Sequence, residues 1–249
     1  MKWDAKLYEQ KHGFVAEYGE SLLPMIPVNP KQSILDIGCG TGTLTAMLGK
    51  KGGRVVGIDS SADMIEEARK LHPEIEFQTK DALNLEYQGE WDVIFSNAVF
   101  HWIRDQKKLL EQVSQALRPG GLLVCEFGAE GNIAVIEKAF QAVLAKRGVS
   151  YSSKFCFPAT EKFCALAESA GLTVENAFDF DRPTPLKEGE KGLYYWARQF
   201  YRDELEAFTG EEQEKILAEL EEETRQRLYN GQEWVADYRR LRMAARKRG

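Results

Sequence analysis

The sequence predicts an α/β fold in which a doubly wound, mostly parallel sheet is covered by helices on both faces. Two observations support it: short apolar runs alternate with stretches of helical periodicity, and turn residues separate most of them. This alternation is typical of βαβ units, whose crossover helices bury both faces of a parallel sheet. The runs predicted to be strands of this sheet are residues 33–38, 55–59, 75–79, 91–96 and 122–127.

Helices are predicted between these strands. Residues 43–51 form the first helix, residues 61–71 the second and residues 106–117 the third. Ser60 or Ser61 is placed to cap the second helix, because a serine hydroxyl can accept a hydrogen bond from a backbone N–H of the first turn. A proline follows the end of that helix, and a Pro-Gly-Gly turn follows the third.

The pattern changes after the fifth strand. We predict a helix at residues 160–170 and a strand at residues 172–180. Two helical stretches follow, at residues 190–208 and 209–230, and the second opens with the capping-box sequence TGEE. The last run, residues 234–247, reads as a strand that pairs antiparallel with the strand at 172–180. A pair of helices is therefore inserted between the last two strands.

Composition restricts the classes of partner. The chain has 249 residues, 43% hydrophobic and 29% charged, with a net charge of −6. This balance argues against nucleic acid, which needs a dense positive surface, and the basic residues at 239–248 suit a solvated strand face better than a binding patch. The first thirty residues are too charged for a signal peptide, and the longest uncharged apolar stretch, 93–103, is too short to cross a membrane. We expect a cytoplasmic protein, monomeric or homodimeric, with no nucleic-acid or membrane partner.

The cysteines and histidines give no sign of a metal site. The four cysteines form no C-x-x-C pair, and the three histidines lie far apart in the sequence. Closely spaced cysteine and histidine ligands are typical of structural zinc sites. We therefore expect no metal and reduced, mostly buried thiols.

The loop ILDIGCGTG, residues 34–42, follows a predicted strand and opens a predicted helix. Its glycines allow a tight turn and the close approach of a ligand to the backbone. The dinucleotide-binding pattern requires a further glycine at position 43, where this chain has Thr43. Asp36 would also repel a pyrophosphate at the helix N-terminus, whereas it would attract an ammonium or sulfonium group. S-adenosylmethionine carries both.

Two further carboxylates follow the next strands. Asp59 ends the second strand, where it could accept both hydroxyls of a ribose, or else cap the following helix. Asp81 ends the third strand and could accept from an adenine amine, while the backbone N–H of Ala82 reaches a ring nitrogen. Taken alone, Asp81 is more typical of a turn residue. Their register with Asp36 favours the ligand roles.

These motifs, together with FSNAVFHW (95–102) and LRPGG (117–121), resemble those of class I S-adenosylmethionine-dependent methyltransferases. The segment WDAKLYEQKHGFV (3–15) and the C-terminal pattern are similar to the trans-aconitate methyltransferase-like group. The resemblance implies a Rossmann-like sheet of seven strands, with the last strand antiparallel and the cofactor at the carboxyl ends of the first strands. It implies that the methionine end is held by Asp36, Gly38, Cys39 and Gly40 and lined by Asn97, and that ribose and adenine are held by Asp59, Ser60 and Met64.

We expect one methyltransferase domain, residues 1–249, made of three parts. The core, residues 30–128, binds the cofactor, and the helical insertion, residues 188–230, lies near the substrate site. Residues 1–30 form a helical segment that closes over the cofactor as a lid or remains a static brace. Candidate substrate residues come from all three parts: Tyr8, His12, Phe14, Phe100, Trp102, Trp196 and Arg198.

Each substrate assignment has a structural alternative. The aromatic residues at 193–201 have helical spacing, so most of them are expected to pack, with one or two facing substrate. Arg198 is either a solvated helix residue or a clamp for a carboxylate. His101 has three readings: it packs or shapes the pocket, it hydrogen-bonds a substrate oxygen, or it removes a proton as the catalytic base.

The reaction itself bears on His101. Methyl transfer from a sulfonium has a neutral leaving group, so a base is needed only when the acceptor is protonated at neutral pH. We favour O-methylation of a small carboxylic acid, because that acceptor needs no base and the trans-aconitate group methylates one. Methylation at nitrogen, carbon or a hydroxyl, and a non-catalytic scaffold that binds the cofactor, remain alternatives. Asp36 and Thr43 count against a nicotinamide-dependent oxidoreductase.

Overall fold

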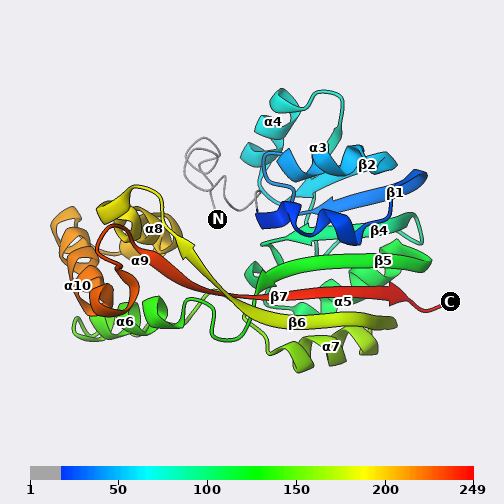
Figure 1. Ribbon diagram of the computed structural model, residues 1–249. Helices are drawn as coiled ribbons and strands as arrows, with labels where there is room; N and C mark the ends of the chain where they lie inside the picture. The colour runs from blue at the N-terminus through cyan, green and yellow to red at the C-terminus, as the bar shows by residue number, and fades with distance from the viewer. Residues whose placement is uncertain (1–17) are drawn as a thin grey trace. The chain divides into compact units, whose positions relative to one another are not determined.

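The computed structural model describes residues 18–249, which divide into two compact units (Figure 1). Of the described residues, unit 1 contains 18–129, 155–179 and 241–249, and unit 2 contains 130–154 and 180–240. The insertion was predicted at residues 188–230; unit 2 extends this range to 180–240 and also includes residues 130–154. Most of the predicted N-terminal lid lies outside the described residues.

The sheet has seven strands in the order β3-β2-β1-β4-β5-β7-β6. The strands β1 to β5 pair in parallel, and β7 runs against its neighbours β5 and β6 (Figure 1). The predicted fold class and the pairing of the last two strands are therefore confirmed. The strands are β1 Asn29–Ile37, β2 Gly52–Asp59, β3 Glu76–Thr79, β4 Trp91–Asn97, β5 Leu117–Gly128, β6 Leu172–Pro185 and β7 Val235–Lys247.

The predicted helices of unit 1 are present, with short 3-10 turns before β1 and after β4. Ser61 caps the second of them: its hydroxyl accepts a hydrogen bond from the Met64 N–H at 3.3 Å. Asp105 caps the third by accepting from the Lys108 N–H at 3.0 Å. The elements are η1 Leu23–Met25, α3 Thr43–Gly49, α4 Ala62–Leu71, η2 Phe100–Trp102, α5 Gln106–Ala116 and α7 Thr160–Ser169.

Apolar side chains cover both faces of the sheet in unit 1, as expected of parallel strands that are buried on both sides. Strand β4 shows how the two layers form, because successive side chains of a strand point to opposite faces. Ile94 belongs to the cluster that includes the helix α5, whereas Val93 and Phe95 belong to the cluster that includes α3. In β1 the six residues that lead into the loop at its carboxyl end, 32–37, are buried.

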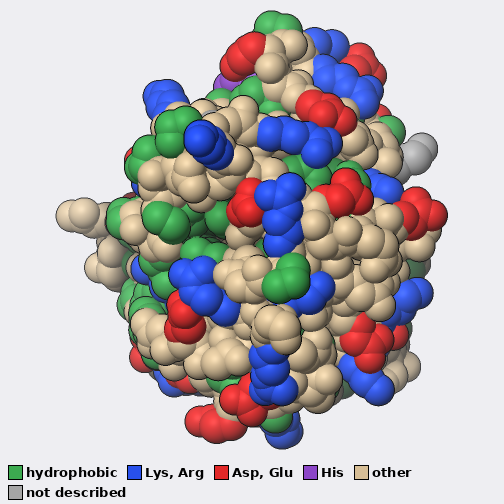
Figure 2. All heavy atoms as spheres, turned by 90° about the vertical axis from the view of Figure 1, so that its right-hand side faces the viewer, with side chains coloured by type: hydrophobic (Ala, Val, Ile, Leu, Met, Phe, Trp, Pro, Cys, Tyr) green, Lys and Arg blue, Asp and Glu red, His purple; other side chains and the backbone are tan. Residues whose placement is uncertain are grey.

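Ion pairs close the edge of the sheet where the parallel strands begin. Arg118 at the start of β5 pairs with Asp92 in β4 at 2.9 Å, and Arg246 in β7 pairs with Glu175 in β6 at 2.7 Å. Figure 2 views this side of the molecule and shows lysine and arginine side chains interspersed with acidic ones. Within β7, however, Arg240 is buried and the Arg242 side chain is only 15% exposed. The prediction of a solvated strand face is therefore wrong for these two residues.

Unit 2 contains the two inserted helical stretches and one further helix. The first stretch is interrupted at Tyr201, and the second begins after Thr209, whose hydroxyl accepts from the Glu212 N–H at 3.4 Å, as the capping-box sequence predicts. The additional helix was not predicted. The elements are α6 Ala134–Ala145, η3 Gly189–Lys191, α8 Gly192–Phe200, α9 Arg202–Leu205 and α10 Gly210–Leu228.

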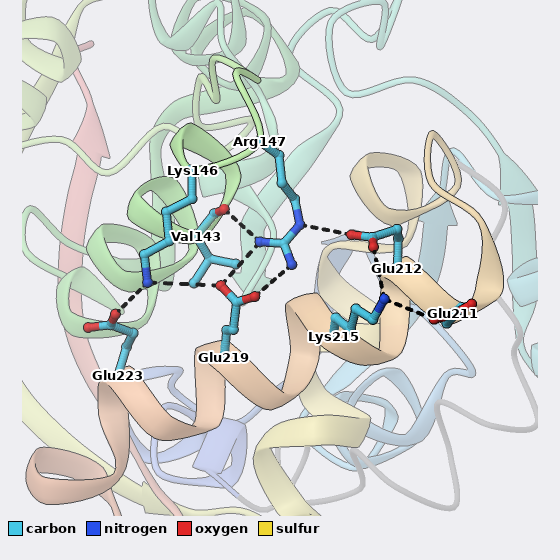
Figure 3. Close-up of polar contacts among 8 residues, drawn as sticks. All are labelled: Val143, Lys146, Arg147, Glu211, Glu212, Lys215, Glu219 and Glu223. Carbon is cyan, nitrogen blue, oxygen red and sulfur yellow. Dashed lines mark hydrogen bonds and ion pairs between the residues drawn. The ribbon is translucent and has the colours of Figure 1, made fainter.

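Charged side chains join the additional helix α6 to α10 (Figure 3). Arg147, just beyond α6, donates to Glu219 at 2.7 Å and to Glu212 at 3.2 Å. Lys146 pairs with Glu223 at 2.9 Å. These contacts connect α6 to α10 within unit 2. Among the described helices, none has the length and apolar composition needed to cross a membrane.

Candidate functional site

The glycine loop after β1 has a backbone that other residues could not adopt at low cost. The N–H groups of Gly38 and Cys39 both donate to the carbonyl oxygen of Ile58, at 2.7 and 3.0 Å. Gly38 has a φ of +75°, and a Cβ there would lie 2.1 Å from Cγ2 of Val99. Gly40 has a φ of +54° with no atom within 4 Å of its Cβ position. The loop is therefore closed against Val99, in the turn after β4, at Gly38 and open at Gly40, where a ligand can approach the backbone.

Asp36 lies at the base of this loop and is buried, with 2% of its surface exposed. The hydroxyl of Thr45 donates to its Oδ2 at 2.7 Å. Burial raises the pKa of Asp36 to about 7, the Thr45 hydrogen bond opposes this shift, and the nearby charge of Asp59 adds to it. Asp36 is thus a carboxylate whose negative charge is poorly stabilised by the protein alone.

Asp59 connects the glycine loop to the start of α4. Its Oδ2 accepts from the Gly40 N–H at 3.1 Å, and its Oδ1 accepts from the Ser61 N–H at 2.8 Å. Burial is the main cause of the raised pKa of Asp59, and these backbone hydrogen bonds oppose it. Since Ser61 caps α4, the helix does not require Asp59 as its cap.

The chemistry of this donor set fits a positively charged ligand that also carries hydroxyl groups. In the part of the chain that the structure describes, no lysine or arginine forms an ion pair with Asp36 or Asp59. Burial raises the pKa of both carboxyl groups, and the charge of Asp59 raises that of Asp36 further. A cation beside them would oppose these shifts. The residues present therefore fit an ammonium or sulfonium group together with a ribose.

The other predicted cofactor residues lie on neighbouring elements of unit 1. Met64 in α4 and Ala82 after β3 are buried, and Ser60 is exposed beside Asp59. Asp81 is exposed, and its Oδ1 accepts from the Leu83 N–H at 2.9 Å, so it does form the turn that its residue type suggested. Asn97 ends β4, and a Cβ at Gly19 would lie 2.8 Å from its Nδ2. The contacts of these residues with a ligand stay predictions.

The hydrogen bond at Nδ1 of His101 determines which ring nitrogen carries the proton. His101 is buried, with 7% of its surface exposed, and its Nδ1 accepts from the Gly128 N–H at 3.2 Å. A neutral imidazole whose Nδ1 accepts must carry its proton on Nε2. With the ring in this form, Nε2 is a hydrogen-bond donor and neither nitrogen is available as a base.

Three aromatic rings lie close to the His101 ring. Trp102 lies 5.4 Å from its ring centre, Phe157 5.7 Å and Phe155 6.2 Å. The carbonyl oxygen of His101 also accepts from the Cys156 N–H at 2.8 Å. The sequence analysis missed Phe155 and Phe157, although the run KFCFP (154–158) is an aromatic signal that could have identified them.

Phe100 differs from its neighbour Trp102. It has no exposed surface and packs against Phe127 and Phe163, with ring centres at 5.6 and 6.4 Å. Trp102 is half-buried. A side chain without exposed surface cannot contact a ligand in this conformation, so Phe100 contributes packing where we had expected a wall of the acceptor site.

The predicted substrate residues of unit 2 have structural partners. Trp196 is buried, and its Nε1–H donates to the Tyr238 hydroxyl at 2.7 Å. Arg198 is exposed and donates to Glu214 at 2.8 Å and to the Tyr194 hydroxyl at 3.0 Å. Both arrangements match the packing and solvated-helix alternatives, and substrate contact stays a prediction. Tyr8, His12 and Phe14 lie outside the described residues.

The cysteine side chains and the possible metal ligands were compared with the expectations from the sequence. Cys39, Cys125, Cys156 and Cys164 are free, and burial raises the pKa of Cys39 far above its ordinary range, with Asp36 and Asp59 adding to the shift. Cys39 in the loop is therefore a thiol and not a thiolate. Within residues 18–249, no group of three or more histidine, cysteine or acidic side chains is arranged to hold a metal ion.

Comparison with known sequences identifies relatives over the whole chain. A family model described as a methyltransferase domain matches residues 34–121. The chain is 31% identical to an uncharacterized methyltransferase of Schizosaccharomyces pombe, with 98% of both chains covered. It is 31% identical to the malonyl-[acyl-carrier protein] O-methyltransferase of Acetivibrio thermocellus over 79% of this chain and 72% of the relative. Trans-aconitate 2-methyltransferase of Azoarcus is 35% identical over 50% of each chain.

Comparison with solved structures supports the same fold. A candidate methyltransferase from Bacillus halodurans superposes with a TM-score of 0.68 at 16% identity, over 94% of this chain and all of the other. Geranyl diphosphate C-methyltransferase from Streptomyces coelicolor, solved with S-adenosyl-L-homocysteine, gives a TM-score of 0.59 at 17% identity, over 95% of this chain and 80% of the other. At these identities the likeness concerns the fold alone.

Proposed function

Because the chain belongs to the class I S-adenosylmethionine-dependent methyltransferases, in the trans-aconitate methyltransferase-like group, we propose that it methylates a carboxyl oxygen of a small acid. It is a methyltransferase whose cofactor is S-adenosylmethionine. The proposal concerns the acceptor and the roles of individual residues.

Residues at the carboxyl ends of β1 and β2 would hold the cofactor. When bound, S-adenosylmethionine supplies a methyl group on a positively charged sulfur. Asp36 would compensate the positive charge at the methionine end, and Gly38, Cys39 and Gly40 would let the backbone approach it. Asp59 and Ser60 would accept the ribose hydroxyls. Further contacts are assigned to Met64, Asp81 and Ala82 at the adenine and to Asn97 at the methionine side.

The observation that carries the carboxylate proposal is the hydrogen bond from the Gly128 N–H to Nδ1 of His101. It makes Nε2 a donor, which suits a carboxylate oxygen and does not suit an acceptor that must lose a proton. A carboxylic acid, with a pKa of roughly 4, is already ionised at neutral pH. The remaining tasks of the protein are to orient the acceptor and exclude water.

The names of two relatives agree with this acceptor class. One is a trans-aconitate 2-methyltransferase and another a malonyl-[acyl-carrier protein] O-methyltransferase. Trans-aconitate is a carboxylic acid, and a malonyl group bound to a carrier keeps one free carboxylate. These relatives share acid chemistry although their acceptors differ in size and charge.

A screen with methyl-labelled S-adenosylmethionine tests the proposal. The purified chain is incubated with separate sets of carboxylic acids, primary amines and phenols, and transfer of label to the acceptor is counted. We expect transfer to acids that is reversed by mild alkaline hydrolysis, as a methyl ester requires. Alkali-stable label on amines or phenols would contradict the carboxylate assignment, and no transfer to any set would favour a non-catalytic scaffold.

The variant His101→Gln tests the role of the ring. Glutamine can donate from its side-chain amide but cannot serve as a base at neutral pH. We expect the variant to raise KM for the acid with little change in the pH dependence of kcat. Loss of an ionisation from the kcat profile would instead identify His101 as a base.

A further inference from the structure

Three half-buried rings, Trp102, Phe155 and Phe157, form a continuous surface beside His101, which we call the aromatic wall. The centres of Trp102 and Phe155 are 4.7 Å apart. Phe155 and Phe157 stack with their centres 5.3 Å apart and their planes 13° from parallel. We infer that this wall binds the acyl chain or aryl group of a monocarboxylic methyl acceptor, whose carboxylate meets the His101 ring. The inference rests on the proposed function and specifies its substrate class.

The wall differs from ordinary core packing by its exposure. Phe100, Phe127 and Phe163 are also close to the end of β4, and each of them is fully buried. Trp102, Phe155 and Phe157 keep part of their surface accessible. Small-molecule sites in proteins are typically lined by aromatic side chains with a few placed polar groups. The wall and the donor on His101 match that composition.

The backbone holds the wall in place. The Cys156 N–H donates to the carbonyl oxygen of His101 at 2.8 Å, so the segment that carries two of the rings is tied to the turn that carries the third. The same turn is fixed from the other side, because Nδ1 of His101 accepts from Gly128 at the end of β5. Rings that are ordered before a ligand arrives lose little freedom when it binds.

The charges around the wall favour a ligand with one carboxylate over a ligand with three. Aromatic surface gains free energy from apolar contact and gives no compensation to a buried anion. Arg104, two residues beyond Trp102, is close enough for its positive charge to oppose the rise in the pKa of Cys156 that burial causes. The positive charge of Arg104 and the neutral donor of His101 suit a single carboxylate. Trans-aconitate, with three carboxylates, would leave anionic groups against the rings.

The experiment compares acceptors and ring variants in the full chain. Initial rates of labelled-methyl transfer are measured with butanoate, octanoate, cinnamate and trans-aconitate. We expect kcat/KM to rise from butanoate to octanoate and cinnamate, and to be at least roughly tenfold lower for trans-aconitate. Phe157→Ala should raise KM for octanoate and cinnamate roughly tenfold, with kcat and the affinity for S-adenosylhomocysteine nearly unchanged.

Phe178→Ala is the matched control, because it removes a phenylalanine ring that is 41% exposed in β6, away from the wall in sequence. We expect it to leave KM for the acids unchanged. Should Phe157→Ala melt well below the wild type, Phe157→Leu removes the ring while keeping apolar volume. Preference for trans-aconitate over octanoate, or equal KM values in the Phe157 and Phe178 variants, would overturn the inference.

A binding measurement separates this inference from the proposed function. If no carboxylic acid is methylated, the proposed function fails, and calorimetric titration of octanoate in the presence of S-adenosylhomocysteine then decides on the wall. Binding that Phe157→Ala weakens roughly tenfold, while Phe178→Ala does not, supports an apolar acid site. Absent binding, or binding unaffected by Phe157→Ala, refutes it.

Discussion

The acidic side chains at two places in the molecule, the contact between α6 and α10 in unit 2 and the glycine loop in unit 1, have opposite surroundings. At α6 and α10, Glu212 and Glu219 each meet the guanidinium of Arg147, and these hydrogen bonds lower the pKa of both carboxyl groups (Figure 3). At the glycine loop, Asp36 is buried and Asp59 is half-buried. Both accept hydrogen bonds from hydroxyl or backbone donors, and their pKa values are raised.

The difference separates a structural contact from a ligand site. Surface carboxylates that are paired with a cation contribute modestly to stability and need no further partner. Buried carboxylates without a cation make folding less favourable than it would be with neutral side chains, and perturbed pKa values of this kind gather at functional sites. The acids of the loop are therefore the ones expected to respond to a cationic ligand.

Among these tests, the variant Asp36→Asn is expected to have the largest effect on the pH dependence of stability. The pKa of Asp36 is about 7 in the folded protein and 3.8 ordinarily, so the folded state binds the proton more tightly. Stability due to this group is therefore full below pH 4 and is lost as the pH rises to about 7. We expect the wild type to lose on the order of 3–4 kcal/mol relative to the variant across that range, since one pKa unit corresponds to about 1.4 kcal/mol.

Urea unfolding of both proteins without cofactor, from pH 4.5 to 8, measures this difference. Thr45 can still donate to the asparagine oxygen, so the hydrogen bond is kept. A difference that stays constant with pH would show that Asp36 ionises normally and that the contrast between the units does not exist.

Gly38→Ala should come next, with a loss of roughly 2–4 kcal/mol in unfolding free energy, because the new methyl group would lie 2.1 Å from Val99. Cofactor binding should fall with it. Gly89→Ala is the control: Gly89 has a φ of +63° but open space at its Cβ position, so backbone strain of about 1 kcal/mol is all that is expected. Urea unfolding checks both, and equal losses would argue against the contact with Val99.

Asp59→Ala should weaken binding of S-adenosylmethionine by roughly 1.5–3 kcal/mol, the scale of hydrogen bonds to a charged group. Isothermal titration measures the affinity. Asp63→Ala removes an exposed carboxylate in the first turn of the neighbouring helix and should leave the affinity unchanged. Unchanged affinity in Asp59→Ala would refute the ribose assignment.

Arg147→Met tests the paired carboxylates of unit 2. We expect a loss of about 1 kcal/mol in stability, reduced at high salt, with no change in cofactor affinity, because the contacts are partly exposed ion pairs. Urea unfolding at low and high salt checks this. Arg202→Met, in an exposed pair with Glu206 at 2.9 Å, should lose less. A loss of cofactor affinity in Arg147→Met would mean that the α6 and α10 contact is more than structural.

Local patterns in the sequence were enough to predict the sheet. The run at 91–96 became β4, and the final run at 234–247 became β7 beside β6, because apolar strands and turn residues are visible within a few positions. Asp36 and Asp59 could likewise be predicted as ligand residues, because each lies at or near the carboxyl end of a predicted parallel strand.

Features that depend on distant partners could not be predicted. The packing of α6 on α10 relies on contacts of Arg147 with residues 65 and 72 positions later. The tautomer of His101 follows from an N–H 27 positions along the chain. The run KFCFP shows that Phe155 and Phe157 are an aromatic pair, but their position beside His101 depends on a distant contact that the sequence pattern does not show.

Asp59 also determines whether the glycine loop becomes ordered when the chain folds or when the cofactor binds. By accepting from Gly40 and Ser61, it crosslinks the loop after β1 to the start of α4 within the protein itself. The conformational entropy of this loop is therefore lost when the chain folds. A cofactor meets a rigid receptor there, and its binding free energy is not consumed by ordering the loop.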